Sequence, residues 1–177
     1  MKSKLKEILS SNSSRMIADK AVQYIGNDNE LYDYVVELSL SEKSPLNWRA
    51  ARAIELSTEK YPEFFMPHVN KIAGLYPNFS TPGLKRSYTK ILANYIEEIS
   101  EDNLSVLIDI SFKYLNSDSQ DIAVRAYCMV FLYKVCEKIP ELKNELKDSI
   151  LLGFPYFSVG LKGASKKILK KLEKIKA

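Results

Sequence analysis

Apolar residues recur every three or four positions along most of the chain, with polar residues between them. Between residues 82 and 100 the apolar positions are Leu84, Tyr88, Ile91, Tyr95 and Ile99. Between residues 121 and 139 they are Ile122, Ala126, Met129, Tyr133 and Cys136. This spacing places the side chains on one face of a helix, whereas a half-buried strand would alternate apolar and polar residues. Both segments are therefore predicted to be amphipathic helices.

Prolines and small polar residues divide the pattern into short helices that come in pairs. Proline fits the first turn of a helix but not its interior, so Pro62, Pro82 and Pro140 are predicted to open helices. The pattern predicts helices over residues 13–25, 29–40, 45–60, 62–76, 82–100, 102–115, 121–139, 140–154 and 161–177. They group into four units, at residues 11–41, 44–76, 81–116 and 120–155, and a terminal helix at residues 160–177.

A basic residue recurs at a similar place in each unit. The positions are 34, 37, 39 and 37 residues apart, at Arg15, Arg49, Arg86, Arg125 and Lys162. Four residues before each stands a residue type that favours the start of a helix, namely Ser11, Pro45, Pro82, Asp121 and Ser158. Paired helices repeated at this period are each too small to bury their own apolar face. The sequence therefore predicts an all-α solenoid in which neighbouring units complete one another's core.

Two of these units carry a pattern that is found in a known family. Residues 121–126 read Asp-Ile-Ala-Val-Arg-Ala before a helix opened by Pro140, and residues 45–51 read Pro-Leu-Asn-Trp-Arg-Ala-Ala before Pro62. Both resemble HEAT repeats, and the resemblance covers about residues 11–155 and the terminal helix. The Trp-x-x-Leu-Gly-x-x-Tyr signature of tetratricopeptide repeats does not recur. The resemblance implies an α-α superhelix of about four helix pairs plus a terminal helix.

The recurrent arginines have a role in HEAT repeats, where arginine and aspartate form a polar ladder between units. The resemblance therefore implies a structural ladder along one edge of the solenoid, with the members Arg15, Arg49, Arg86, Asp121 and Arg125. Only Asp121 supplies an aspartate to this ladder. A row of guanidinium groups that binds phosphate is the alternative, because arginine pairs equally well with both groups.

Composition places the whole chain, residues 1–177, in a single globular domain, with 46% hydrophobic residues and few glycines and prolines. Cys128 and Cys136 are eight residues apart on one predicted helix. Their Cα atoms are then roughly 12 Å apart, beyond the reach of a disulfide, so both are predicted to be reduced core thiols. The longest apolar run, residues 126–133, is too short to cross a bilayer. We expect a cytoplasmic protein without membrane insertion.

Charge is distributed unevenly along the chain. Residues 161–177 hold seven lysines and one glutamate, whereas residues 21–160 hold 14 basic and 19 acidic residues. The last helix combines an apolar stripe with a basic patch consisting of Lys162, Lys166, Lys167, Lys170, Lys171 and Lys174. This helix is interpreted as a polar cap that keeps the end of the solenoid soluble. The alternative is a surface for nucleic acid, anionic lipid or an acidic protein.

Catalytic and metal-binding motifs are missing from the sequence. His68 is the one histidine, and the chain has no glycine-rich phosphate loop, Cys-x-x-Cys, His-Glu-x-x-His or Gly-x-Ser-x-Gly. We therefore predict no catalytic residue, no metal site, no cofactor and no enzymatic activity. Trp48 is interpreted as a packing residue near a helix start, with an anchor for a partner as the alternative.

The predicted function is that of a small scaffold that binds another protein along its second helices. Successive helices of a solenoid form an extended surface of this kind. The predicted contact residues are Tyr32, Tyr34, Phe65, His68, Lys71, Lys113 and Lys147. The alternative is nucleic-acid binding, as in HEAT-like proteins that excise alkylated bases from DNA with an aspartate flanked by tryptophans and arginines. The chain has one tryptophan, so we expect only weak, non-specific affinity for nucleic acid.

Overall fold

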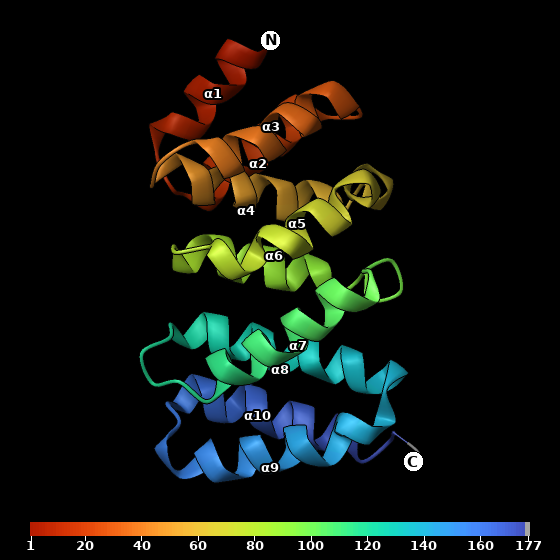
Figure 1. The fold of residues 1–177 in the computed structure, drawn as a ribbon. Coiled ribbons are helices and arrows are strands. Elements are labelled where there is room, and N and C mark those ends of the chain that lie inside the picture. The colour runs from red at the N-terminus through yellow and green to blue at the C-terminus, as the bar shows by residue number, and fades with distance from the viewer. Residues whose placement is uncertain (176–177) are drawn as a thin grey trace.

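The computed structural model describes residues 1–175, and these residues form helices joined by short connections, with no strand among them (Figure 1). Ten α-helices are present in this part of the chain. They are α1 (Lys2–Ser11), α2 (Arg15–Ile25), α3 (Asn29–Ser41), α4 (Leu46–Thr58), α5 (Val69–Leu75), α6 (Pro82–Leu92), α7 (Glu101–Leu115), α8 (Ile122–Lys138), α9 (Lys143–Gly153) and α10 (Val159–Leu172). Short 3-10 helices cover Pro62–His68, Tyr76–Asn78, Pro140–Leu142 and Phe154–Tyr156. The prediction of an all-α repeat solenoid is confirmed.

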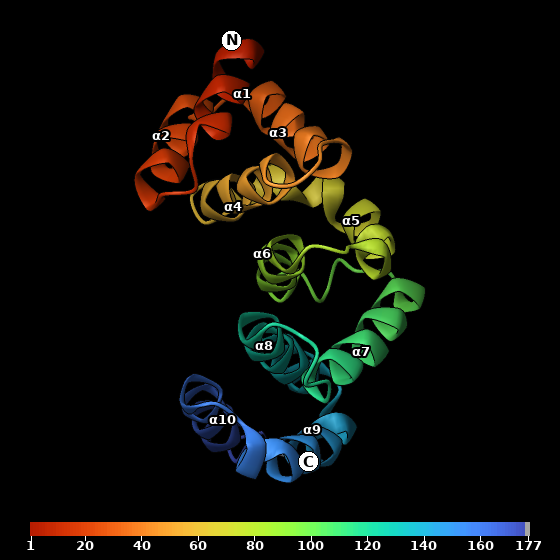
Figure 2. The ribbon, with the colours of Figure 1, turned by 90° about the vertical axis from the view of Figure 1, so that its left-hand side faces the viewer.

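The helices lie in two layers that curve together (Figure 2). We call α2, α4, α6, α8 and α10 the inner layer, because they line the concave side of the arc. We call α3, α5, α7 and α9 with their adjoining 3-10 helices the outer layer, which lies on the convex side. Neighbouring inner helices pack directly on one another along the stack, while α1 covers the N-terminal end against α2 and α4. The concave side is therefore one continuous surface made by consecutive inner helices.

Side-chain caps set the start of several helices. Ser14, Asp28, Asp121 and Ser158 each accept a hydrogen bond from a backbone N–H in the first turn of the helix that follows. Such a cap satisfies a donor that has no partner within the helix. Asp121 and Ser158 were predicted as helix starts. Ser11 was also predicted as one, but it is the last residue of α1, and α2 begins after Ser14.

The core runs between the two layers along the whole stack. It is built from one large cluster of buried apolar side chains, in which Tyr32, Phe65 and Tyr88 contribute the largest fully buried rings. Cys128 and Cys136 are both buried and unpaired, as predicted. Within residues 1–175 no helix combines the length and apolar content needed to cross a bilayer.

The helix pattern differs from the prediction after Leu92 and at the N-terminal end. The helix predicted over residues 82–100 ends at Leu92, and turns follow up to Ser100. These turns bury Tyr95, Ile96 and Ile99, and the Tyr95 hydroxyl donates to the Pro62 carbonyl at 2.7 Å. The apolar residues of this stretch are thus buried as predicted, but turns place them in the core instead of a continuous helix. The other difference is α1, which the sequence analysis missed although Leu5, Ile8 and Leu9 bury one face of it.

Proline also shapes the outer layer more strongly than predicted. The helix predicted over residues 62–76 is a 3-10 helix up to His68, with Pro67 inside it, followed by α5. The helix predicted over residues 140–154 likewise opens as a 3-10 turn and becomes α9 at Lys143. Both segments open with a proline at the first helical position, where its missing N–H has no partner to lose, and Pro67 interrupts the first segment before α5 begins. Of the predicted terminal helix, residues 176 and 177 lie outside the described residues.

Candidate binding surface on the inner layer

Charge separates between the two layers. In the five inner helices lysine and arginine outnumber aspartate and glutamate 15 to 3. In the outer layer the order is reversed, with ten acidic residues against four lysines. The predicted division into basic ends and an acidic middle describes the chain order, whereas the folded chain sorts its charges across the stack. The inner layer is therefore the basic layer of the molecule.

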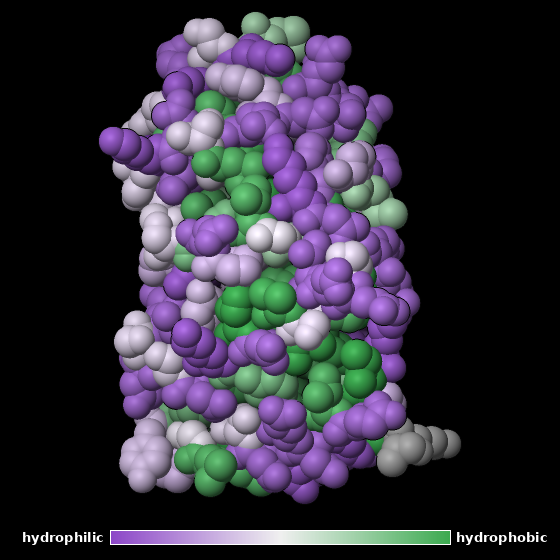
Figure 3. Space-filling model, viewed as in Figure 1, coloured by the Kyte–Doolittle hydropathy of each residue, from purple (hydrophilic) through white to green (hydrophobic). Residues whose placement is uncertain are grey.

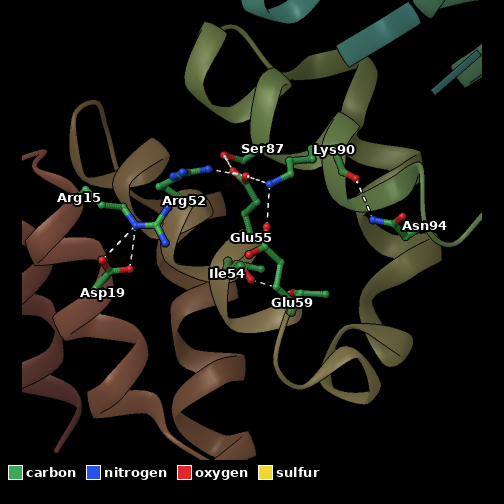
Figure 4. A network of polar contacts seen from close by, with 10 residues as sticks. Arg15, Asp19, Arg52, Ile54, Glu55, Glu59, Ser87, Lys90 and Asn94 are labelled. Atoms are coloured by element: carbon green, nitrogen blue, oxygen red, sulfur yellow. Dashed lines mark hydrogen bonds and ion pairs between the residues drawn. The ribbon is translucent and has the colours of Figure 1, made fainter. Parts of the chain in front are cut away.

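A buried carboxylate lies between two helices of the inner layer. Glu55 of α4 is 2% exposed and accepts hydrogen bonds from Arg52 of its own helix and from two residues of α6 (Figure 4). The Lys90 ammonium lies 2.7 Å from its Oε1, and the Ser87 hydroxyl donates to its Oε2 at 2.9 Å. Lys90 also donates to Glu59 at 2.7 Å. This network joins α4 of the second helix pair to α6 of the third.

The partners of Glu55 decide its ionisation. Burial alone would raise the pKa of this carboxyl, but hydrogen bonds from Arg52, Lys90 and Ser87 outweigh burial and the pKa is lowered. For Lys90, burial would lower the pKa, and hydrogen bonds to Glu55 and Glu59 raise it instead. Both groups are thus held in their charged forms. A carboxylate held ionised by two cations is a structural bridge and is poorly suited to donate a proton.

The residues of the predicted ladder are placed along the inner layer but form separate local contacts. Arg15 pairs with Asp19 of its own helix, and Nε of Arg15 lies 2.9 Å from the carboxylate. Arg49 reaches the neighbouring unit, where it donates to the Ser10 carbonyl at the end of α1 at 2.9 Å. Asp121 caps α8 by accepting from the Ala123 N–H.

The remaining two arginines of this set differ sharply in their contacts. Arg125 is 8% exposed, donates to the Leu115 carbonyl at 3.0 Å and to Asp118 at 2.8 Å, and lies over the Phe157 ring. Arg86 is half-buried and forms no hydrogen bond or ion pair with any described residue, and its Nε is buried. Asp121 and Arg86 line the same pocket without an ion pair between them.

The predicted contact residues lie on the outer layer, and two of them are unavailable to a partner. Tyr32 and Phe65 are 0% exposed, because they belong to an aromatic cluster between α3, the 3-10 helix Pro62–His68 and α6. The prediction that they contact a partner is therefore wrong for the folded chain. Periodicity alone could not separate them from exposed aromatic residues on the same helices.

The other predicted contact residues are at the surface. The Nε2 atom of His68 lies 2.7 Å from Asp33 Oδ1, and Lys71 donates to Glu37 at 2.6 Å. Tyr34 is half-buried under Lys2, while Lys113 and Lys147 are exposed. Figure 3 shows this outer face, where hydrophilic side chains surround apolar surface near α7. Acidic residues outnumber lysines in this layer, so it offers no extended basic surface.

The lysines of the terminal helix divide into two groups. Lys166, Lys167, Lys170, Lys171 and Lys174 are exposed, while Lys162 is half-buried. Lys162 donates to the Pro155 carbonyl at 3.2 Å, and Lys171 lies over the ring of Tyr133 from α8. The apolar stripe of α10 buries Leu161, Ile168 and Leu172. The contact between Lys171 and Tyr133 therefore links the basic patch of α10 to the neighbouring inner helix α8.

Metal-binding and nucleophilic chemistry find little support in the part of the chain that is described. No three histidine, cysteine or acidic side chains lie close enough there to hold a metal ion. Burial raises the pKa of Cys128 to about 12 and that of Cys136 to about 11. Both thiols stay protonated at neutral pH and are poor nucleophiles.

Comparison with known proteins identifies one family. A family model described as a HEAT repeat domain matches residues 4–172. Among curated proteins and solved structures, nothing matches the chain.

Proposed function

Since the chain belongs to the HEAT repeat family, we propose that it is a non-catalytic scaffold that binds an acidic segment of another protein along its inner layer. The separation of charge between the two layers carries this proposal. An acidic partner is attracted by the concave side and repelled by the convex side. The binding surface is therefore the inner layer, in place of the second helices suggested by the sequence.

The pattern of charges along the inner layer favours a protein over a nucleic acid. A duplex backbone presents uniform negative charge at close intervals. The concave side instead places carboxylates among its cations, with Asp19 beside Arg15, Glu59 beside Lys90 and Glu137 beside Lys134. Each of these carboxylates would repel a phosphate backbone. A polypeptide with acidic residues at intervals meets the cations and avoids the carboxylates.

Aromatic side chains support the same proposal. Trp48 of α4 and Tyr133 of α8 are half-buried on inner helices, and each lies against a basic side chain. Rigid aromatic residues and arginines are the residue types that contribute most to protein interfaces. A segment bound here would combine ion pairs with apolar contacts.

The proposal is tested by comparing two triple variants with labelled poly-L-glutamate as the probe. The inner-layer variant combines Arg15→Glu, Lys134→Glu and Lys171→Glu. The outer-layer variant combines Lys71→Glu, Lys113→Glu and Lys147→Glu, so both lose the same net charge. Fluorescence anisotropy should show that the inner-layer variant binds roughly tenfold or more weakly than the unmodified chain. The outer-layer variant should change the affinity by less than about twofold.

A 20-base-pair DNA duplex provides the competing measurement. If the duplex binds more tightly than poly-L-glutamate at physiological salt, nucleic-acid binding replaces the present proposal. Equal losses in the two triple variants would show that net charge alone attracts the probe and would also overturn it. Circular dichroism of each variant establishes that the helices are intact.

A further inference from the structure

Arg86 of α6 stands apart from the other arginines of the inner layer. Arg15, Arg52 and Arg125 each pair with a carboxylate, and Arg49 donates to carbonyl oxygens of the first helix pair. Arg86 has no acceptor among the described residues, although its Nε is buried. A buried N–H group that lacks an acceptor costs free energy, because it has lost its hydrogen bond to water and gained none from the protein. An anionic ligand would supply the missing acceptor.

Arg86 lines a pocket of about 270 Å³ between the starts of α4, α6 and α8. Trp48 of α4 forms one wall, while Thr81 and Gly83 at the start of α6 form another. Gly83 is required for this geometry, because a Cβ there would lie 2.6 Å from Trp48 Cβ. The close approach brings the first turn of α6 and the indole ring to the same small cavity.

The start of α6 adds donors to those of Arg86. Thr81 precedes the helix but forms no side-chain cap, and its hydroxyl is buried without a hydrogen-bond partner. Pro82, the first residue of α6, has no N–H, so the first-turn donors without a partner in the helix are the N–H groups of Gly83 and Leu84, and such groups attract anions. Guanidinium and helix N–H groups together match the geometry of a phosphate. Asp121 is the one carboxylate of this pocket, and it is engaged with the Ala123 N–H.

We propose that this Trp48–Arg86 pocket binds a phosphate group, either free inorganic phosphate or a phosphorylated side chain of the acidic partner. Arg86 provides the charge, the first turn of α6 provides backbone donors, and Trp48 packs against the carrier of the phosphate. The phosphorylated side chain as the source rests on the proposed function. Binding of inorganic phosphate does not depend on it, so the two ideas can fail separately.

The single tryptophan makes the test direct, because Trp48 is the only one in the chain and lines the pocket. Its fluorescence is recorded during titration with inorganic phosphate, against sodium chloride at equal ionic strength. We expect a saturable change with phosphate alone. Arg86→Gln should weaken the affinity at least tenfold. Arg49→Gln is the matched control, since Arg49 lies 5.8 Å from the Trp48 ring outside this pocket, and it should change the affinity by less than twofold.

Asp121→Asn is a second variant that distinguishes a phosphate site from a water-bridged ion pair between Asp121 and Arg86. Asparagine caps helices as well as aspartate, so α8 should keep its start. Loss of the negative charge should tighten phosphate binding several-fold if the pocket is a phosphate site. If the phosphate affinity stays unchanged and the melting temperature falls, Asp121 is the partner of Arg86 and the proposal is wrong. If Arg86→Gln fails to fold, Asp121→Asn still tests whether the pocket is a phosphate site.

A peptide with one phosphoserine flanked by glutamates identifies the source of the phosphate. It should bind at least tenfold more tightly than inorganic phosphate, and replacing the phosphoserine by serine should remove the gain. If inorganic phosphate binds but neither peptide nor poly-L-glutamate does, the proposed function is wrong, while phosphate binding in the Trp48–Arg86 pocket is supported. If poly-L-glutamate binds the inner layer while phosphate gives the same response as chloride, the pocket proposal fails alone.

Discussion

At the scale of single residues, burial determines how much each ion pair contributes to the free energy of unfolding. Glu55 and Glu59 both accept a hydrogen bond from Lys90 at 2.7 Å, but their side chains are 2% and 54% exposed. Water screens the exposed pair, whereas the buried carboxylate depends on its protein partners. The two glutamates are therefore a matched pair for measuring the effect of burial.

Replacing Glu55 by Gln should destabilise the fold by about 1–3 kcal/mol, because Arg52, Lys90 and Ser87 lose a charged acceptor. Glu59→Gln should cost less than about 1 kcal/mol. Chemical denaturation at neutral pH measures both free energies of unfolding. Equal costs for the two variants would contradict a central role for Glu55.

The acid dependence of stability provides a second measurement on the same variant. The pKa of Glu55 is lower in the folded chain than its ordinary value, so the stabilisation is present above that value. It is lost as the pH falls through the folded pKa. Below about pH 5 the unmodified chain should lose stability more steeply than Glu55→Gln. If the stability of the two proteins falls equally with pH, Glu55 is not the source of the acid dependence.

Arg125 should owe its contribution to packing and carbonyl contacts more than to its ion pair. Its partner Asp118 is 86% exposed, whereas the guanidinium is buried against the Leu115 carbonyl and the Phe157 ring. Arg125→Ala should lower the stability by about 1–3 kcal/mol. Asp118→Asn should change it by less than about 1 kcal/mol. Thermal denaturation of the two variants compares these values, and an unchanged midpoint for Arg125→Ala would contradict the assignment.

At the scale of elements, two glycines in inner helices should respond in opposite ways to a methyl group. A Cβ on Gly83 would meet Trp48, while a Cβ on Gly163 would have no atom within 4 Å. Gly83→Ala should destabilise the chain by about 1–3 kcal/mol through overpacking. Gly163→Ala should stabilise it by about 0.5–1 kcal/mol, since alanine loses less backbone freedom in a helix. Denaturant midpoints test both signs.

How far the sequence predicts an element depends on whether local signals determine its ends. The predicted segment 121–139 agrees closely with α8, because Asp121 caps it and Pro140 follows it. The predicted segment 82–100 failed at Leu92, because Tyr95 bonds to a residue of another unit. No local pattern reports that contact. The missed helix α1 did have a signal, since Leu5, Ile8 and Leu9 already show helical spacing.

The candidate surface follows the same rule. Counting charges along the chain produced basic ends. Counting them for each predicted helix would have shown that the first helices are net positive and that the second helices are net negative, except for the neutral segment 62–76. The Trp48–Arg86 pocket was beyond prediction, because it joins the starts of three inner helices. The network around Glu55 joins α4 to α6 and likewise requires the stacking of neighbouring units.

At the scale of the whole molecule, each unit of the stack contacts only its neighbours. The central helices α4, α6 and α8 are covered by units on both sides, whereas α1 and α10 lie at the ends. Stability in such a solenoid depends on interfaces between neighbours. Backbone amides of α6 and α8 should therefore exchange with solvent more slowly than those of α1 and α10. Hydrogen exchange followed by mass spectrometry measures this order, and faster exchange in α6 would contradict it.

The opposite charges of the two layers also make the molecule an electric dipole whose axis crosses the stack from the convex to the concave side. In the field of an approaching polyanion this dipole experiences a torque before any contact forms. The chain is turned so that its concave side leads, and more encounters then occur in a productive orientation. Ionic strength would therefore control the association rate more strongly than the dissociation rate.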